Sequence, residues 1–146
     1  MRLSAKSRYA LAAVTHMARQ PNLNEYITVI SISEKLGISK IYLEQVFSLL
    51  RRGGIVHSVK GAQGGYQLTR PPKEISVLDV LSTIEISLFE PAEDTVPETA
   101  PDIEEALRFV FQGLDEAIFQ KLQEISVADL VAEADKHGED FIMYYI

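Results

Sequence analysis

Apolar residues recur along the first half of the chain at the spacing of one helix face. In residues 4–20 they fall at i, i+3, i+4 and i+7, and a proline follows, so we predict a helix there. A short helix over residues 31–36 is expected to begin at the capping box Ser31-x-x-Glu34. After a tight glycine turn, residues 39–52 predict a third helix. Its buried face is expected to be Leu43, Val46, Phe47 and Leu50.

Two short helices joined by a tight turn are typical of a helix-turn-helix. They are followed by two strand-like runs, residues 55–60 and 66–69, on either side of the glycine-rich residues 61–65. This order predicts a winged helix-turn-helix, whose second helix can enter the DNA major groove while the hairpin lies over phosphates or the adjacent minor groove. The glycine-rich turn matches neither common nucleotide-phosphate loop, and it leads into a strand rather than a helix.

The longest predicted helix, residues 102–125, opens with the capping box Asp102-x-x-Glu105 and would be about 35 Å long. Its apolar stripe is broader than one small domain needs to cover. We interpret it as a dimerisation helix, the alternative being burial within its own chain. The stripe comprises Ile103, Leu107, Val110, Leu114, Ile118, Leu122 and Ile125, widened by Phe109, Phe111 and Phe119. The residues expected to carry dimerisation are Val110, Leu114, Ile118 and Leu122.

The predicted fold is therefore mainly α with a small β-hairpin. Capping boxes at Ser76-x-x-Asp79 and Ser126-x-x-Asp129 predict two more short helices, the second ending near Gly138. The expected organisation is a winged helix-turn-helix domain (1–86), an acidic proline-containing linker (87–101), the dimerisation helix (102–125), and a short helix with a C-terminal tail (126–146).

The charge of the chain is divided between its halves. The net charge is −7, but residues 1–73 hold 11 Lys and Arg against 3 Glu, a net of +8, and residues 74–146 have a net of −15. A basic half favours a polyanion such as DNA, although the charges alone would also fit scattered solvated surfaces. No apolar run approaches the ~20 residues that span a bilayer, and no secretory signal is evident, so we expect a cytoplasmic protein without membrane contact.

The sequence contains no cysteine, which excludes disulfides, cysteine-bound zinc and thiolate-bound iron–sulfur clusters formed by this chain. Its three histidines are widely spaced, so we expect no metal site and no cofactor. No set of Ser, His and Asp or of metal-spaced carboxylates falls on one element. An enzymatic function is therefore not expected.

Four segments resemble the Rrf2 family of bacterial winged-helix regulators. They are RLSAKSRYA at residues 2–10, YLEQ at 42–45, LRRG at 50–53, and SVKG with GGY within 58–66. The similarity extends in order over nearly the whole chain. It implies a homodimer whose long helices cross and whose recognition helices bind the two halves of a palindromic operator in double-stranded DNA.

The resemblance also implies which side chains face DNA. Gln45 suits the N6 and N7 atoms of adenine, and Glu44 can accept a hydrogen bond from cytosine N4. Tyr42 is equally suited to a structural role, and Ile41 stands where a polar side chain would be expected. The implied DNA-binding residues are Ser39, Tyr42, Glu44 and Gln45 on the recognition helix, Lys60 on the wing, and Lys6 and Arg8 at phosphates.

Cluster-binding relatives carry three cysteines where this chain has residues 89–97 without one, so the cluster-sensing function of the family is not expected here. The tail, residues 140–146, resembles that of the cluster-free branch, which represses cysteine metabolism together with O-acetylserine sulfhydrylase. An extended tail with a free carboxylate would then bind this enzyme through Tyr144, Tyr145 and Ile146. The alternative is that the tail folds back onto the long helix or forms a strand.

Three hypotheses follow. The first is a sequence-specific repressor of cysteine and sulfur metabolism controlled by the partner enzyme. The second is a regulator of the same fold that senses another small molecule in a pocket between the wing domain and the long helix. The third is a protein–protein adaptor with weak DNA binding, for which binding would depend little on salt.

Overall fold

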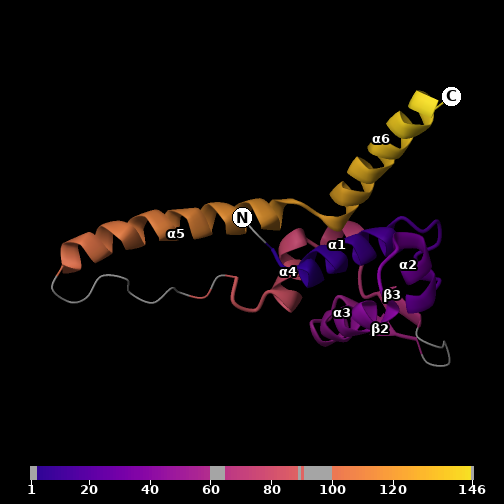
Figure 1. The fold of residues 1–146 in the computed structure, drawn as a ribbon, viewed down its shortest axis with the longest axis horizontal. Coiled ribbons are helices and arrows are strands. Elements are labelled where there is room, and N and C mark those ends of the chain that lie inside the picture. The colour runs from indigo at the N-terminus through magenta and orange to yellow at the C-terminus, as the bar shows by residue number, and fades with distance from the viewer. Residues whose placement is uncertain (1–2, 60–64, 89, 91–99, 146) are drawn as a thin grey trace.

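The computed structural model describes residues 3–59, 65–88, 90 and 100–145, with side chains to residue 138 (Figure 1). Helices dominate, and the described strands form one small antiparallel sheet, as the sequence predicts. In chain order the elements are α1 (Ala5–Ala18), β1 (Ile27–Thr28), α2 (Val29–Leu36), α3 (Lys40–Arg52), β2 (Val56–Ser58), β3 (Gly65–Leu68), the 3-10 turn η1 (Pro72–Glu74), α4 (Val77–Ile84), α5 (Pro101–Glu124) and α6 (Val127–Tyr145).

The helix-turn-helix consists of α2 and α3, with α1 packed against both. The turn between them is tight because Gly37 adopts a left-handed conformation, φ +67°, at the end of α2. The Ser33 hydroxyl donates to the Ile38 carbonyl at 2.6 Å and fastens the turn. Helix α3 therefore leaves α2 at an angle that places its apolar face on the core.

The predicted start of α2 is wrong. The helix begins at Val29, and its N-cap is Thr28, whose hydroxyl accepts the Ser31 N–H at 3.1 Å. Ser31 thus lies inside the first turn, and no capping box forms at that position. The reason is tertiary, since β1 pairs with β3, aligning Ile27 with Tyr66, and the chain turns into a helix as soon as that pairing ends.

The wing is the antiparallel pair of β2 and β3, in which Val56 aligns with Leu68 and Ser58 with Tyr66. Strand β3 lies in the middle of the sheet, in the order β1-β3-β2. The sequence predicts the hairpin but not the pairing of β1 with β3. The wing tip, residues 60–64, lies outside the described residues.

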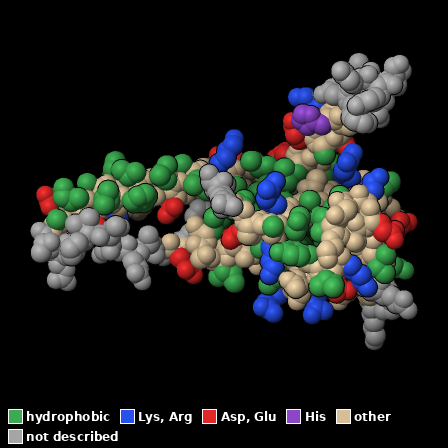
Figure 2. All heavy atoms as spheres, viewed as in Figure 1, with side chains coloured by type: hydrophobic (Ala, Val, Ile, Leu, Met, Phe, Trp, Pro, Cys, Tyr) green, Lys and Arg blue, Asp and Glu red, His purple; other side chains and the backbone are tan. Residues whose placement is uncertain are grey.

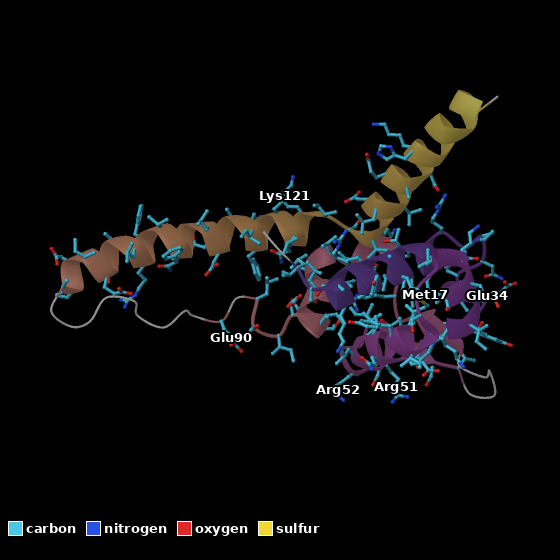
Figure 3. All side chains as sticks on the ribbon, in the orientation of Figure 1. Met17, Glu34, Arg51, Arg52, Glu90 and Lys121 are labelled. Atoms are coloured by element: carbon cyan, nitrogen blue, oxygen red, sulfur yellow. The ribbon has the colours of Figure 1, made fainter. Side chains whose placement is uncertain are left out.

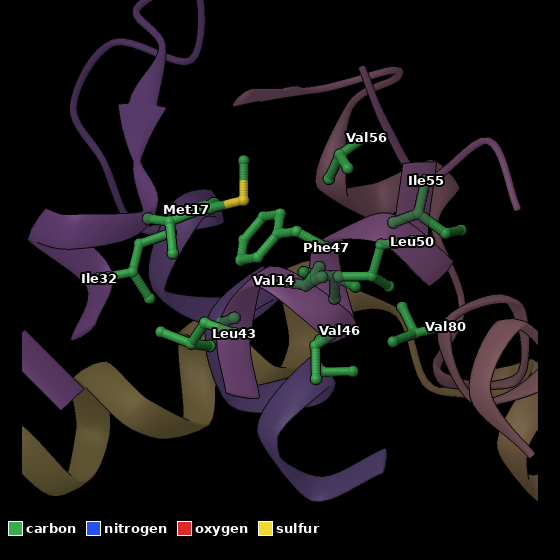
Figure 4. Close-up of a cluster of buried hydrophobic side chains, with 14 of the residues drawn as sticks. Val14, Met17, Ile32, Leu43, Val46, Phe47, Leu50, Ile55, Val56 and Val80 are labelled. Carbon is green, nitrogen blue, oxygen red and sulfur yellow. The ribbon is translucent and has the colours of Figure 1, made fainter. Parts of the chain in front are cut away.

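The main core lies where α1, α2, α3 and the sheet meet (Figure 4). Phe47 is its largest fully buried side chain, and its ring packs on Tyr66 of β3 with centroids 4.7 Å apart. Removing such a ring from a core costs about 3–5 kcal/mol. The predicted buried face of α3 is confirmed, since each of its members is fully buried. These residues are Leu43, Val46, Phe47 and Leu50.

A second apolar cluster joins α4 to the C-terminal end of α5. It comprises Val77, Leu78, Leu81 and Leu122, with Ile118 and Ile125 packed beside them. Backbone bonds reinforce the junction, because Val77 N–H donates to Ile125 O, and Val127 N–H to Ile75 O, both at 2.8 Å. The rest of α5 projects from the domain as a long arm (Figure 1).

Helix α5 does not begin at the predicted capping box. Its first residue is Pro101 and its N-cap is Ala100, so Asp102 lies in the first turn and no side-chain cap is formed. Proline is favoured at this position because its missing N–H would have no helical partner there and its φ is already helical. The predicted end of the linker therefore shifts by one residue, while residues 91–99 lie outside the described residues.

The C-terminal helix is longer than the sequence predicts. The box of Ser126 and Asp129 forms, with both hydrogen bonds at 2.9 to 3.0 Å, but α6 continues through Gly138 to Tyr145. The prediction of a short helix followed by an extended tail is wrong for residues up to 145. A single glycine costs a helix only about 1 kcal/mol relative to alanine, which is too little to end it.

Candidate nucleic-acid interface

Helix α3 presents a solvent face directly opposite its buried one. Ile41, Gln45, Ser48 and Arg52 follow one another at i, i+4, i+7 and i+11, and all four are exposed. This spacing places them in one line along the helix. The helix is held from behind by the core, so the line is presented on a rigid support, as base recognition requires.

Glu44 and Ser39 lie at the edge of this face. The Glu44 carboxylate is 3.7 Å from the Lys40 ammonium one turn earlier, and both side chains are exposed. Exposed ion pairs of this kind contribute less than about 1 kcal/mol to stability. The Glu44 carboxylate can therefore leave Lys40 and accept a hydrogen bond from another donor at little cost. Ser39 is the N-cap of α3 but forms no side-chain cap bond, and its exposed hydroxyl faces solvent.

Tyr42 has a structural contact as well as an exposed edge. Its ring meets that of Tyr9 of α1 edge to face, with centroids 5.4 Å apart and an interplanar angle of 86°. Such pairs contribute about 0.5–1.5 kcal/mol beyond burial. Because Tyr42 remains 39% exposed, the contact fixes the direction of the ring without hiding it.

The beginning of α1 lies beside α3. Lys6 borders an open hollow of about 590 Å³ together with five residues of α3, whereas Arg8, two residues further along α1, is exposed to solvent. The helix itself is capped by Ser4, whose hydroxyl accepts the Ser7 N–H at 3.2 Å. The residues of α3 that line this hollow are Ile41, Glu44, Gln45, Ser48 and Leu49.

Two further cations belong to this surface and were not among the predicted contacts. Arg51 and Arg52 project from the last turn of α3 away from the core (Figure 3). Within the part of the chain that the structure describes, neither forms an ion pair. Their signal in the sequence is a pair of arginines at a helix end, which also stabilises the helix dipole and so does not by itself indicate a ligand.

Side-chain hydrogen bonds join the two strands of the wing to each other and to the segment that precedes β1. His57 Nε2 and Gln67 Oε1 are 2.9 Å apart across the β2–β3 pair, and Gln67 Nε2 donates to the carbonyl of Asn24. Lys60, the predicted wing contact, lies outside the described residues. The structure thus fixes the base of the wing next to α3.

The predicted dimerisation residues fall into two groups. Val110 and Leu114 lie on the projecting part of α5 and are exposed, Leu114 by 53%. Ile118 is half-buried and Leu122 is 9% exposed, because both pack on α4 of their own chain. Leu122 therefore anchors the arm rather than lying on its free face.

The predicted partner-binding residues lie at the end of α6. Tyr144 and Tyr145 are the last residues of the helix, and their side chains are not described. Ile146 lies outside the described residues. The contact predicted for them remains a prediction.

The donor set does not fit an iron–sulfur cluster. The sequence has no cysteine to supply a thiolate, and among the described residues no three His, Asp or Glu side chains are grouped to hold a metal ion. No helix in the described part of the chain is long and apolar enough to cross a membrane.

Comparison with known proteins gives the family. Residues 3–133 match the family model Rrf2, described as an iron-dependent transcriptional regulator. A putative HTH-type transcriptional regulator of Azotobacter vinelandii is 36% identical over 143 residues, covering 92% of this chain and 82% of the relative. IscR of Cereibacter sphaeroides is 42% identical over 86 residues, and that match covers 58% of this chain and 56% of IscR.

Solved structures agree over a greater length. The structure of CymR from B. subtilis, described as the global cysteine regulator, superposes with a TM-score of 0.72 at 30% identity, covering 91% of this chain and 98% of CymR. IscR from T. potens superposes with a TM-score of 0.72 at 31% identity, covering 94% of this chain and 90% of the IscR chain. These relatives are named as regulators, and none of them as an enzyme. The exposed face of α3, the adjoining basic start of α1 and the matches over most of the chain lead to one conclusion: this protein belongs to the Rrf2 family of DNA-binding transcriptional regulators.

Proposed function

We propose that the protein is a homodimeric repressor of cysteine and sulfur metabolism genes that binds a palindromic operator through α3. The observation that carries the sulfur assignment is the likeness to CymR, which extends over nine-tenths of this chain, combined with the absence of the cysteines that cluster-binding members use. A cluster-free regulator needs another source of control. O-Acetylserine sulfhydrylase, the partner implied by the tail, is the proposed one.

In this proposal Gln45 contacts a base and Lys6 contacts phosphate. Gln45 lies centrally on the exposed line of α3, and its side chain forms no hydrogen bond with another described residue. Gln45→Ala should reduce discrimination at one base pair by about 1–3 kcal/mol. Lys6→Ala and Lys60→Ala should weaken all sequences similarly and reduce the salt dependence of binding by about one phosphate contact. Identical base-substitution profiles for these variants would contradict the separation of roles.

Dimerisation is assigned to the projecting part of α5. Hydrophobic side chains run along much of its visible face (Figure 2), and Phe109 is 81% exposed. Burying a phenylalanine from such exposure contributes about 2–3 kcal/mol, and a symmetric dimer would bury it on both protomers. An apolar arm of this size left in water would favour aggregation, so a second copy of α5 is its proposed cover.

A single charge tests this assignment. Leu114→Glu should convert the dimer to a monomer in light scattering and weaken binding to a palindrome far more than binding to a half-site. Gln123→Glu is the matched control, since residue 123 is exposed on α5 on the side of the helix opposite Leu114 and far from Phe109. An undisturbed dimer with Leu114→Glu would overturn the proposed interface.

The proposed enzyme contact involves Tyr144, Tyr145 and Ile146. Because α6 runs to Tyr145, the last turn would have to unwind for an extended segment to enter an active site. Helix ends fray readily, so this requirement is modest. Deleting residues 145–146 should leave dimerisation intact and abolish calorimetric binding to O-acetylserine sulfhydrylase. An unchanged affinity would refute the tail contact while leaving the regulator in place.

The decisive experiment is selection of genomic DNA fragments by the purified protein, with and without the host's O-acetylserine sulfhydrylase. Palindromic sites near cysteine and sulfur-uptake genes, enriched further by the enzyme, are the expected result. Sites elsewhere that do not respond to the enzyme would overturn the sulfur assignment. Enrichment of no sequence would favour the adaptor hypothesis.

A small-molecule sensor is the second candidate, and one cavity favours it. An open hollow of about 470 Å³ lies between α1, α2 and α6, rather than between the wing domain and α5. Leu11, Leu36 and Leu130 form apolar walls, while Arg19 and Lys35 supply cationic groups. Burial, followed by the charges of Lys35 and Arg19, lowers the pKa of His16, so its imidazole is mainly neutral at pH 7. A shift in DNA affinity caused by a small organic anion alone would support the sensor.

A further inference from the structure

The outward line of α3 contains one apolar side chain among polar ones. Ile41 is 70% exposed at the second residue of the helix, whereas the positions that follow it on the same line are Gln45, Ser48 and Arg52. Single exposed apolar residues are common and need no explanation by themselves. The position of this one, in the first turn of a recognition helix, is what gives it meaning, because the N-terminal residues of such helices contact base edges.

Among the described residues, no packing contact accounts for an isoleucine at this position. It packs in neither of the two core clusters. A β-branched residue also forms helix slightly less readily than alanine or the straight-chain polar residues, so Ile41 does not favour the helix. The side chain instead borders the open hollow that it shares with Lys6 and Gln45, which is where a DNA base edge would lie.

The chemistry of isoleucine selects one base. It neither donates nor accepts hydrogen bonds, and it would desolvate a polar base edge without compensation. In the major groove only thymine presents an apolar group, its C5-methyl, and apolar side chains contact that group. We infer that Ile41 is a specificity-determining residue that packs on the thymine C5-methyl group of one base pair in each operator half-site. The inference rests on the proposed binding of DNA by α3.

The helix also limits where that thymine lies. Ile41 and Gln45 are four residues apart, which is about 6 Å along the helix axis. Base pairs are separated by about 3.4 Å. The thymine should therefore lie about two base pairs from the one that Gln45 contacts, and nearer the base pairs approached by the N-terminus of α3.

Removing a single methyl group from the DNA tests the inference. Each thymine of the selected operator is replaced in turn by uracil, which keeps the base pairing and hydrogen-bonding groups and lacks only the methyl. At one position in each half-site, uracil should weaken binding of the wild-type protein about four- to tenfold, and binding of Ile41→Ala less than twofold. At that position 5-methylcytosine should bind more tightly than cytosine by a similar factor, and only to the wild-type protein.

Two further variants serve as controls. Ile86→Ala removes an exposed isoleucine two residues beyond the end of α4 and should leave the uracil effect unchanged. Gln45→Ala should weaken binding but keep the uracil effect at the Ile41 position. If DNA binding does not depend on the thymine methyl group, or depends on it equally in the wild type and in Ile41→Ala, this inference is wrong, although the protein still binds the operator. Failure to select any operator overturns the inference and the proposed function together.

Discussion

Gly53 ends α3 at the place where that helix crosses α4, and it cannot be replaced by alanine without moving one of them. A Cβ at this position would overlap Cγ2 of Thr83 and lie 2.8 Å from the Thr83 Cβ. Gly53 has an ordinary right-handed conformation, with φ −80° and ψ −1°. The residue is therefore glycine because α4 comes close, not because the backbone demands it.

Two opposing effects determine the consequence of Gly53→Ala. Alanine restricts the unfolded chain and on that account stabilises a protein by about 0.4–1 kcal/mol where it fits. Ordinary carbon contacts lie at about 3.5–4.0 Å, so here the helices must separate by roughly an ångström, and such overpacking costs about 1–3 kcal/mol. The net expectation is a loss of about 1–2 kcal/mol in the free energy of unfolding.

Urea denaturation followed by circular dichroism measures the change, as a lower midpoint with an unchanged slope. Thr83→Ala, which removes Cγ2, should restore part of the loss in the double variant. Gly138→Ala in α6 is the matched control, because the nearest atom to its Cβ would be Arg19 Nη2 at an unstrained 3.9 Å, and we expect it to stabilise the protein. If Gly53→Ala were as stabilising as Gly138→Ala, the close approach of α3 and α4 would be refuted.

Two electrostatic contacts give further predictions. Burial raises the pKa of Asp79, but hydrogen bonds from Ser76 and Arg70 outweigh it and lower that pKa below its ordinary value. Asp79→Asn should therefore cost about 1 kcal/mol at pH 7, and the cost should disappear as the pH falls below about 4; equal costs in urea titrations at pH 7 and pH 3 would contradict this. Glu85 accepts the buried Ser7 hydroxyl at 2.9 Å, so Glu85→Ala should cost about 1–2 kcal/mol. In the Ser7→Ala variant, the same change at Glu85 should cost less. If the two substitutions instead lower the melting temperature additively, the contact between the two side chains contributes nothing to stability.

The sequence predicts the buried and exposed faces of α3 because local periodicity determines them. The buried positions of α3, spaced i, i+3, i+4 and i+7, identify the opposite face without any knowledge of neighbouring elements. Helix starts are less predictable. The choice of Thr28 over Ser31 as the N-cap of α2 depends on the pairing of β1 with β3, almost forty residues away. A local capping preference contributes only about 1 kcal/mol, so the strand pairing determines where the helix begins.

Contacts between elements account for the other differences. The apolar stripe of α5 is evident from the sequence, but periodicity does not say which neighbour covers each part, and Leu122 packs on α4. The edge-to-face contact of Tyr42 with Tyr9 depends on how α1 crosses α3, which no local pattern specifies. The sequence underestimates the length of α6 because a glycine is typical of a helix end, although Gly138 has no positive φ and no close neighbour that would require a glycine.

The packing of α4 makes the spacing between operator half-sites a test of the proposed dimer. One side of α4 meets α3 at Thr83 and Gly53, and its other side holds Leu122 of α5. The recognition helix and the arm are thus parts of one packed body, and a dimer formed through the arms would hold its two recognition helices at a fixed separation and rotation.

Adding five base pairs at the centre of the palindrome turns one half-site by about half a helical turn, and adding ten restores the phase at a greater distance. Both insertions should reduce affinity to that of a single half-site in gel-shift titrations. Tight binding to either one would mean that the connection through α4 is flexible, and the rigid-body argument would fail.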